Sequence, residues 1–133
     1  MKFMVMIYNE SNALDALSPG EFDATMRTCL AHADELRVNG RLIESRMLDV
    51  PSTAKSVRMR NGKLSTVDGP FAEAKEVLGG FNLIEARDMD EAIEIASHFP
   101  WIKTGCVEIR PVQDIDEVRV RVGAPPEPEM RPV

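Results

Sequence analysis

Cysteine, histidine and tryptophan are scarce in this sequence. Its 133 residues include two cysteines, two histidines and one tryptophan. Cys29 and Cys106 fall in different segments, so we expect reduced thiols rather than a disulfide framework, as is usual in the cytosol. The cysteines and histidines lack the ligand pattern of a metal site, and the chain has no phosphate-binding loop or catalytic triad motif. We therefore expect neither a metal nor a cofactor.

Basic residues do not outnumber acidic residues in this chain. The chain has 16 basic and 22 acidic side chains, which give a net charge of -6. This charge repels phosphate backbones and anionic membranes, so neither nucleic acid nor a membrane is expected as a partner. The apolar run at residues 2–8 is too short for a signal peptide or a membrane span. Because 44% of the residues are hydrophobic and can build a core, we expect a single-domain cytoplasmic protein.

Strand and helix patterns alternate along the chain. The apolar run at 2–8 predicts a central strand that is buried on both faces. Residues 18–40 predict a helix, in which Ser18 is the N-cap, Glu21 completes a capping box and Gly40 is the stop signal. The apolar stripe of this helix consists of Phe22, Met26, Cys29, Leu30, Ala33 and Leu36.

The strongest hairpin signal lies at residues 55–67, around Asn61-Gly62. Both turn residues accept positive φ angles, which a type I′ turn requires. A two-residue turn sets the register, which pairs Arg60 with Lys63, Met59 with Leu64 and Val57 with Thr66. Met59 and Leu64 are therefore expected on one face of the hairpin.

The remaining elements complete a repeated pattern. Strands are predicted at 41–48, 79–86 and 105–112, and a helix at 88–99 with Asp88 and Glu91 as a capping box. The order β-α-β, hairpin, β-α-β predicts an α+β fold, a ferredoxin-like split βαβ antiparallel sheet with an inserted hairpin and helices on one face. The other face is partly apolar and uncovered, so we expect a symmetric homodimer that buries sheet against sheet.

The chain divides into two parts by composition. Residues 1–112 form the predicted domain, and residues 113–133 form a C-terminal extension. Within the extension, one reading of residues 116–122 is a strand that crosses to a partner copy, and the role of this segment is left open. The proline-rich acidic tail after them is expected to be extended or disordered.

Four segments carry a family resemblance: MKFMVMIY at the start, NGRLIES after the first helix, DGPFAEAKEVLGGF at 68–81, and VEIRPV. Together they resemble the DGPF group of the YCII-related family over residues 1–112. The resemblance implies a dimeric α+β barrel. It implies no single reaction, since some relatives resemble small-molecule lyases or dehalogenating enzymes. Some genes of the DGPF type lie beside those of extracytoplasmic-function sigma factors.

One departure from the family bears on catalysis. Smaller YCII-like proteins are thought to pair a His on the first helix with an Asp just before a Pro after the second helix. At the matching positions this chain has Cys29 and Phe99, so neither half of that dyad is present. Cys29 is read as a core residue with a raised pKa. His32 and His98 lie nearby in sequence and are interpreted as solvated helix residues.

The DGPF segment has two interpretations. In the first, Asp68 and the following Gly-Pro form a turn that leads into a short helix at 70–77, and the charges of Glu73, Lys75 and Glu76 are a solvated face. In the second, the N-terminus of that helix binds a ligand, with Phe71 as a hydrophobic wall and Lys75 orienting an anionic group.

Two functions of different class follow. In the first, the protein binds a small molecule in a pocket between sheet and helices, lined by Tyr8, Glu44, Asp68 and Phe71. Asp68 is the candidate catalytic base or polar anchor there, and catalysis itself is left open. In the second, the protein is a non-catalytic regulatory partner associated with an extracytoplasmic-function sigma factor, whose acidic surface binds a basic protein.

Overall fold

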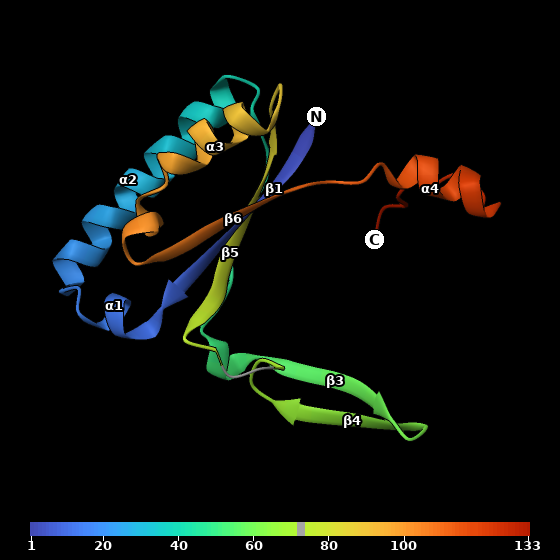
Figure 1. The fold of residues 1–133 in the computed structure, drawn as a ribbon, viewed down its shortest axis with the longest axis horizontal. Coiled ribbons are helices and arrows are strands. Elements are labelled where there is room, and N and C mark those ends of the chain that lie inside the picture. The colour runs from blue at the N-terminus through green and yellow to red at the C-terminus, as the bar shows by residue number, and fades with distance from the viewer. Residues whose placement is uncertain (72–73) are drawn as a thin grey trace.

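The computed structural model describes residues 1–71 and 74–133. A four-stranded antiparallel sheet has the order β2-β5-β1-β6 (Figure 1). Its strands are β1 (Lys2–Glu10), β2 (Leu42–Met47), β5 (Glu76–Glu85) and β6 (Gly105–Pro111). A separate hairpin, β3 (Lys55–Arg60) and β4 (Lys63–Asp68), is inserted between β2 and β5. This order confirms the predicted α+β fold, a ferredoxin-like split βαβ sheet with an inserted hairpin.

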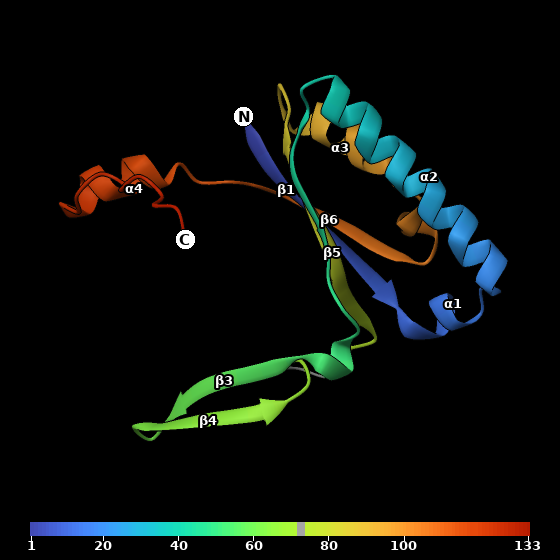
Figure 2. The same ribbon diagram turned by 180° about the vertical axis from the view of Figure 1, so that it is seen from behind.

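The long helices cover one face of the four-stranded sheet, and Figures 1 and 2 show the other face without a helix. The helices of this body are α1 (Ser11–Asp15), α2 (Pro19–Val38) and α3 (Met89–Ser97), with short 3-10 turns η1 (Pro51–Thr53) and η2 (Pro100–Lys103). None of the described helices is long and apolar enough to cross a membrane.

Local capping signals determine where the two long helices begin. At α2 the Oγ atom of Ser18 accepts a hydrogen bond from the Glu21 N–H at 3.1 Å, and the Glu21 carboxylate accepts one from the Ser18 N–H at 3.2 Å. This confirms the predicted capping box. At α3 only half of the predicted box forms. Asp88 accepts from the Glu91 N–H, but the Glu91 carboxylate accepts from the Arg87 N–H and pairs with Arg41 instead.

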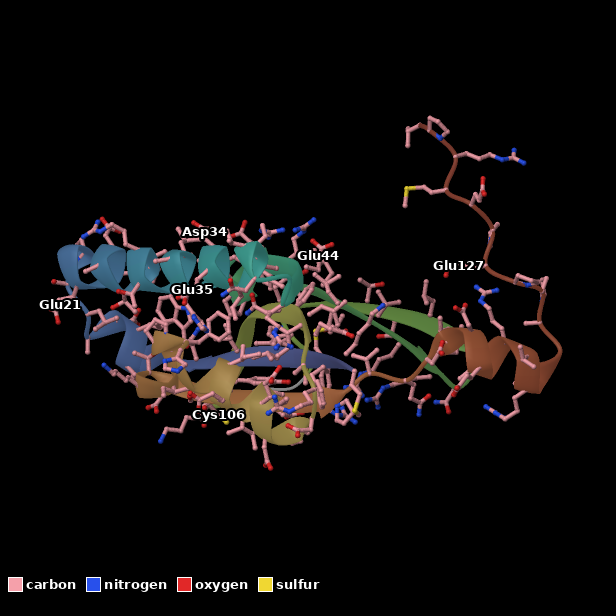
Figure 3. The ribbon with its side chains drawn as sticks, turned by 90° about the horizontal axis from the view of Figure 1, so that it is seen from above. Glu21, Asp34, Glu35, Glu44, Cys106 and Glu127 are labelled. Carbon is pink, nitrogen blue, oxygen red and sulfur yellow. The ribbon has the colours of Figure 1, made fainter. Side chains whose placement is uncertain are left out.

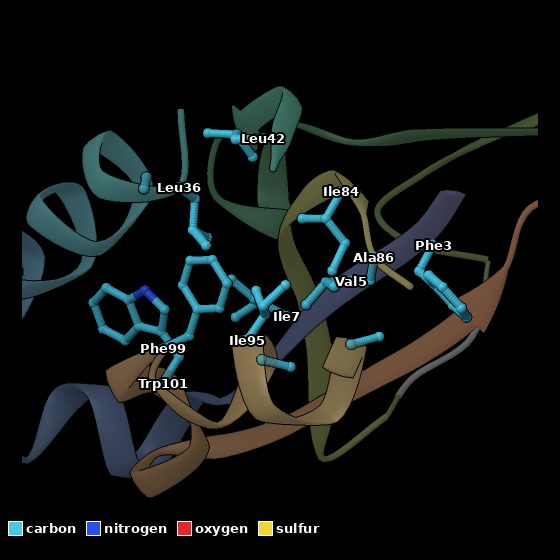
Figure 4. Close-up of a cluster of buried hydrophobic side chains, with 13 residues drawn as sticks. Phe3, Val5, Ile7, Leu36, Leu42, Ile84, Ala86, Ile95, Phe99 and Trp101 are labelled. Carbon is cyan, nitrogen blue, oxygen red and sulfur yellow. The ribbon is translucent and has the colours of Figure 1, made fainter. Parts of the chain in front are cut away.

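The hydrophobic core lies between the sheet and its helices (Figure 4). Phe3, Val5 and Ile7 of β1 point into it and are buried, whereas the alternating residues are only half-buried. The prediction that this strand is buried on both faces is therefore wrong for the single protomer. The strand is central, as expected, but helices cover only one of its faces.

The uncovered side of the sheet is called the open face here. Strand register places the half-buried apolar side chains of β1 and β5 at its centre, and polar or charged side chains of β2 and β6 at its two edges. Its central residues are Met4, Met6, Tyr8, Phe81 and Leu83, and its edge residues are Glu44, Arg46, Cys106, Glu108 and Arg110.

The hairpin, residues 55–68, projects from the body on the side of the open face (Figures 1 and 2) and is called the arm. Its register is the predicted one, with Asn61 and Gly62 both at positive φ. Its base is closed by a 2.8 Å hydrogen bond from the Gly69 N–H to the Ala54 carbonyl. The two arm strands pair with each other and with no other described strand.

Two predicted elements are wrong. The helix expected at 70–77 is not formed by the described residues: Phe71 lies in a bend and β5 begins at Glu76. The first residues of β5 pair with Tyr8, Asn9 and Glu10, and these long-range bonds outweigh the local helix signal. Glu73, also expected in that helix, lies outside the described residues.

The segment expected to be a crossing strand forms helix α4 (Ile115–Val122). Asp114 caps its start by accepting from the Asp116 N–H, and Gly123 ends it in the left-handed conformation. These two caps favour a helix, whereas the alternating valines of this segment would favour a strand. Residues 124–133 have no regular secondary structure.

Candidate functional site

A pocket of about 410 Å³ lies between α2 and the sheet. Phe22, Met26 and Leu30 of α2 form one wall, and Gly79 and Gly80 of β5 form part of the opposite wall. The glycines leave the sheet surface without side chains at this point, and a β-bulge between β1 and β5 occurs there. The hollow lies where Gly79 and Gly80 present no side chains to the residues of α2 that face them.

Two amides, Asn9 and Asn82, are among the mostly apolar residues that line this pocket. Asn82 of β5 is only 3% exposed, and its Oδ1 atom accepts a hydrogen bond from the Ser45 hydroxyl at 2.7 Å. No hydrogen bond among the described residues uses its Nδ2 group, and this group is not among the fully buried atoms without a partner. Since the residue lines the pocket, its Nδ2 group is placed to donate to a bound molecule.

Sequence reasoning missed Asn82, although a signal was present. The strand FNLI is apolar except for this residue, whose side chain faces the helices, where an unpaired amide is costly. A lone amide on the covered face of a strand therefore indicates either a structural hydrogen bond or a ligand contact. In this protein the Ser45 hydroxyl fills one acceptor position of its carbonyl oxygen.

The titratable groups of the pocket do not form an acid-base pair. Burial raises the pKa of the Cys29 thiol above its usual value, as expected, and a hydrogen bond with Trp101 opposes that shift. Arg46 and Asp49 are its other titratable lining residues. Asp49 accepts from the Val50 N–H at 2.7 Å, and Arg46 forms an ion pair with Glu44. The neutral thiol favours binding over nucleophilic attack.

The two positions that correspond to the family's His-Asp dyad lie in different surroundings. Cys29 lines the pocket, whereas Phe99 is fully buried in the core. His32 was expected to be solvated, and this is wrong: it is half-buried, its Nε2 atom lies 2.9 Å from the Ile95 carbonyl, and its ring packs edge-on against Phe99. His98 is exposed and contacts Glu94, in agreement with a solvated helix residue.

The residues predicted to line a pocket between sheet and helices do not line the one found there. Tyr8 and Glu44 lie on the open face, because strand residues alternate between faces and their neighbours Ile7 and Ser45 take the covered one. Figure 3 shows Glu44 and Cys106, which come from the two edge strands of the sheet. A ligand role for Tyr8 and Glu44 therefore stays a prediction, separate from the pocket around Asn82.

The residues of the DGPF region lie at the arm. Asp68 is exposed and forms an ion pair with Lys55 across the hairpin. Phe71 is 76% exposed, its carbonyl accepts from Arg58 at 3.2 Å, and the Arg58 guanidinium lies 5.9 Å from its ring centre. Lys75 lies 3.7 Å from a Glu10 carboxylate oxygen. A ligand role for these residues stays a prediction, and they share no pocket with Tyr8 or Glu44.

Other site chemistry is limited in the part of the chain that the structure describes. Residues 1–71 and 74–133 contain no cluster of three His, Cys, Asp or Glu side chains that could hold a metal ion. Cys29 and Cys106 are both free thiols.

Comparison with known proteins shows which family this chain belongs to. The YCII-related domain matches residues 1–116. The chain belongs to the YCII-related family. An uncharacterized protein of Rhizobium meliloti (strain 1021) is 33% identical over 114 residues, which cover 84% of this chain and 92% of that protein.

A solved structure with the same fold has a named activity. It is the 5-chloro-2-hydroxyhydroquinone dehydrochlorinase of Burkholderia phenoliruptrix, in complex with 2,5-dihydroxybenzoquinone. The likeness has a TM-score of 0.51 at 14% identity and covers 85% of this chain and 94% of that one. At this identity it supports the fold of the YCII-related chain.

Proposed function

We propose that this YCII-related protein binds a small, mostly apolar molecule with a hydrogen-bond acceptor in the pocket beneath α2. The observation that carries the proposal is the Asn82 side chain, which lines the pocket, accepts from Ser45, and has an Nδ2 group that no described hydrogen bond uses. A carbonyl or hydroxyl oxygen on the ligand would complete its hydrogen bonding.

Size and lining support this function. Small-molecule sites usually have volumes of about 300–1,000 Å³ and apolar walls with a few polar groups, and the pocket has both properties. A ring compound with one or two oxygen atoms fits this description. The dihydroxybenzoquinone bound by the dehydrochlorinase of the same fold is a ligand of this class and serves as a first probe.

Catalysis forms no part of the proposal. General acid-base chemistry needs a titratable group within reach of the reacting atom, and the described pocket offers a neutral thiol and an Asp already engaged by a backbone N–H. The YCII-related dyad of smaller relatives has no counterpart at Cys29 and Phe99. Binding is the function that the remaining groups support.

We further propose that the protein is a homodimer that buries the open face. The centre of that face is apolar and half-exposed in the protomer, which is the surface that a second copy would cover. Sedimentation of the full chain as a dimer is the expected result.

The binding proposal is tested by a thermal-shift screen of small ring compounds and aliphatic acids, esters and ketones. A ligand that binds only the folded state raises the melting temperature. The variant Leu30→Trp fills the pocket from its rim, because Leu30 lines the pocket and is 51% exposed. We expect a compound that stabilises the wild type and fails to stabilise Leu30→Trp.

Asp68→Asn is the matched control, since Asp68 lies on the arm and outside this pocket. It should leave the ligand response intact. A response lost in Asp68→Asn and kept in Leu30→Trp would move the site to the DGPF region. If no compound shifts the wild type, the pocket proposal fails and a regulatory protein partner, as in the sigma-factor hypothesis, becomes the function to test.

A further inference from the structure

The arm has two chemically different faces. Its register places Val57, Met59 and Leu64 on one face, where they are 61%, 66% and 70% exposed. The other face carries Arg58, Arg60 and Lys63. A hairpin with an apolar face and no element packed against it is only marginally stable in water. The arm therefore has the composition of a surface that packs against something else.

Charge separates the arm from the rest of the chain. The arm carries four of the 16 basic side chains and one of the 22 acidic ones, so the remaining residues have 12 basic against 21 acidic. A basic arm on a strongly acidic body is complementary to a second copy of the same body. Acidic side chains such as Asp34 and Glu35 stand on α2 (Figure 3), and Glu44 and Glu108 lie on the open face.

The charges at the tip of the arm also favour contact with another molecule. Arg60 and Lys63 lie directly opposite each other across the turn, and like charges in that position destabilise a hairpin. At the base the opposite holds, since Lys55 faces Asp68 and pairs with it. The unfavourable pair at the tip is relieved if acidic groups of another molecule lie beside it.

The position of the arm identifies where that molecule sits. The arm and α4 both project on the side of the open face in two opposite views (Figures 1 and 2). A copy that covers the open face must therefore come up against the arm. We propose that each arm packs its apolar face against the partner of a homodimer, with Arg60 and Lys63, at the tip of its opposite face, lying beside acidic side chains of the partner that flank the arm. This inference rests on the homodimer proposed above.

The test uses the full chain and sedimentation equilibrium of Arg60→Glu with Lys63→Glu. This double variant keeps a like-charge pair at the tip, so the hairpin itself is changed little, but it reverses the charge that the partner meets. Its control is Arg27→Glu with Lys103→Glu, the same residue types and charge change at exposed positions on α2 and η2. We expect the dimer dissociation constant to rise by about tenfold more in the arm variant than in the control at about 0.05 M salt.

Hydrogen exchange of the wild type gives a second measurement that needs no variant. Arm amides between Val57 and Leu64 should exchange more slowly where the dimer forms than at dilutions where it dissociates. A dimer with equal effects of the two double variants and equal arm exchange at both concentrations overturns the arm proposal alone. A wild type that is monomeric at all concentrations overturns the homodimer and the arm proposal together, and leaves the pocket proposal intact.

Discussion

The four-stranded body and the two-stranded arm use apolar residues in opposite ways. Phe99 of the body is fully buried between the helices and the sheet, whereas Phe71 beside the arm is 76% exposed. Both sheets are built from hydrogen-bonded antiparallel pairs, so backbone pairing does not distinguish them. The difference is that helices cover the body, whereas none of the described helices packs on the arm (Figures 1 and 2). Backbone pairing alone therefore does not make a stable unit, and side-chain burial does.

The two phenylalanines test this difference most strongly. Phe99→Ala should lower the free energy of unfolding by about 3–5 kcal/mol, because it removes a buried ring and leaves a cavity. Phe71→Ala should change it by less than about 0.5 kcal/mol in dilute protein, because the ring is exposed there. Chemical denaturation measures both. Equal losses would show that the arm belongs to the core.

Two glycines give the next comparison. A Cβ at Gly105 would lie 1.9 Å from the Tyr8 carbonyl oxygen, so Gly105→Ala must push β6 away from β1. We expect a loss of about 1–3 kcal/mol in global stability, as for overpacked sites. Gly62→Ala strains the arm turn, where φ is +75°, and meets no neighbouring atom. It should speed arm amide exchange and leave global unfolding unchanged; a matching drop in global stability would mean that arm and body unfold together.

Two serines test the same contrast at smaller magnitude. Ser18→Ala removes the N-cap of α2 and should cost about 1 kcal/mol in thermal or chemical unfolding. Ser56→Ala removes a 2.7 Å hydrogen bond from its hydroxyl to the Gly69 carbonyl at the base of the arm. The chemical change is the same, but the second should alter only local exchange in the arm. A larger global loss for Ser56→Ala would contradict the division.

The two cysteines give the smallest effect and a pH signature. Burial raises the pKa of the Cys29 thiol above its usual value in the folded protein, so the neutral thiol is favoured there. Its contribution to stability is complete below about pH 9 and is lost as pH rises through the folded pKa. Cys29→Ala should therefore reduce the loss of melting temperature above pH 9, and Cys106→Ala, at an exposed site, should leave it unchanged. The same alkaline loss in wild type and Cys29→Ala would rule this account out.

Sequence patterns predicted the local features well. The capping box of α2 and the register of the arm follow from residues within a few positions of each other, such as Ser18 with Glu21 and Asn61 with Gly62. The alternation of strands and helices was sufficient to predict the topology, because few arrangements satisfy short connections and one-sided burial.

Sequence patterns failed where distant residues compete with local ones. The short helix expected after Pro70 is replaced by the start of β5, because β1 supplies strand partners that no local pattern reveals. The pocket residues were missed for the same reason. Cys29 is far in the chain from Gly80 and Asn82, and it meets them only when α2 packs across the sheet.

Neighbouring residues and composition were enough to predict most elements of this YCII-related protein, the capping box of α2 and the turn of the arm. Which face of each strand the helices cover depends on the tertiary packing. That choice left Tyr8 and Glu44 on the open face and enclosed Asn82 beneath α2. The physical reason is that burial depends on contacts between distant segments, and a shift of one residue along a strand exchanges its two faces.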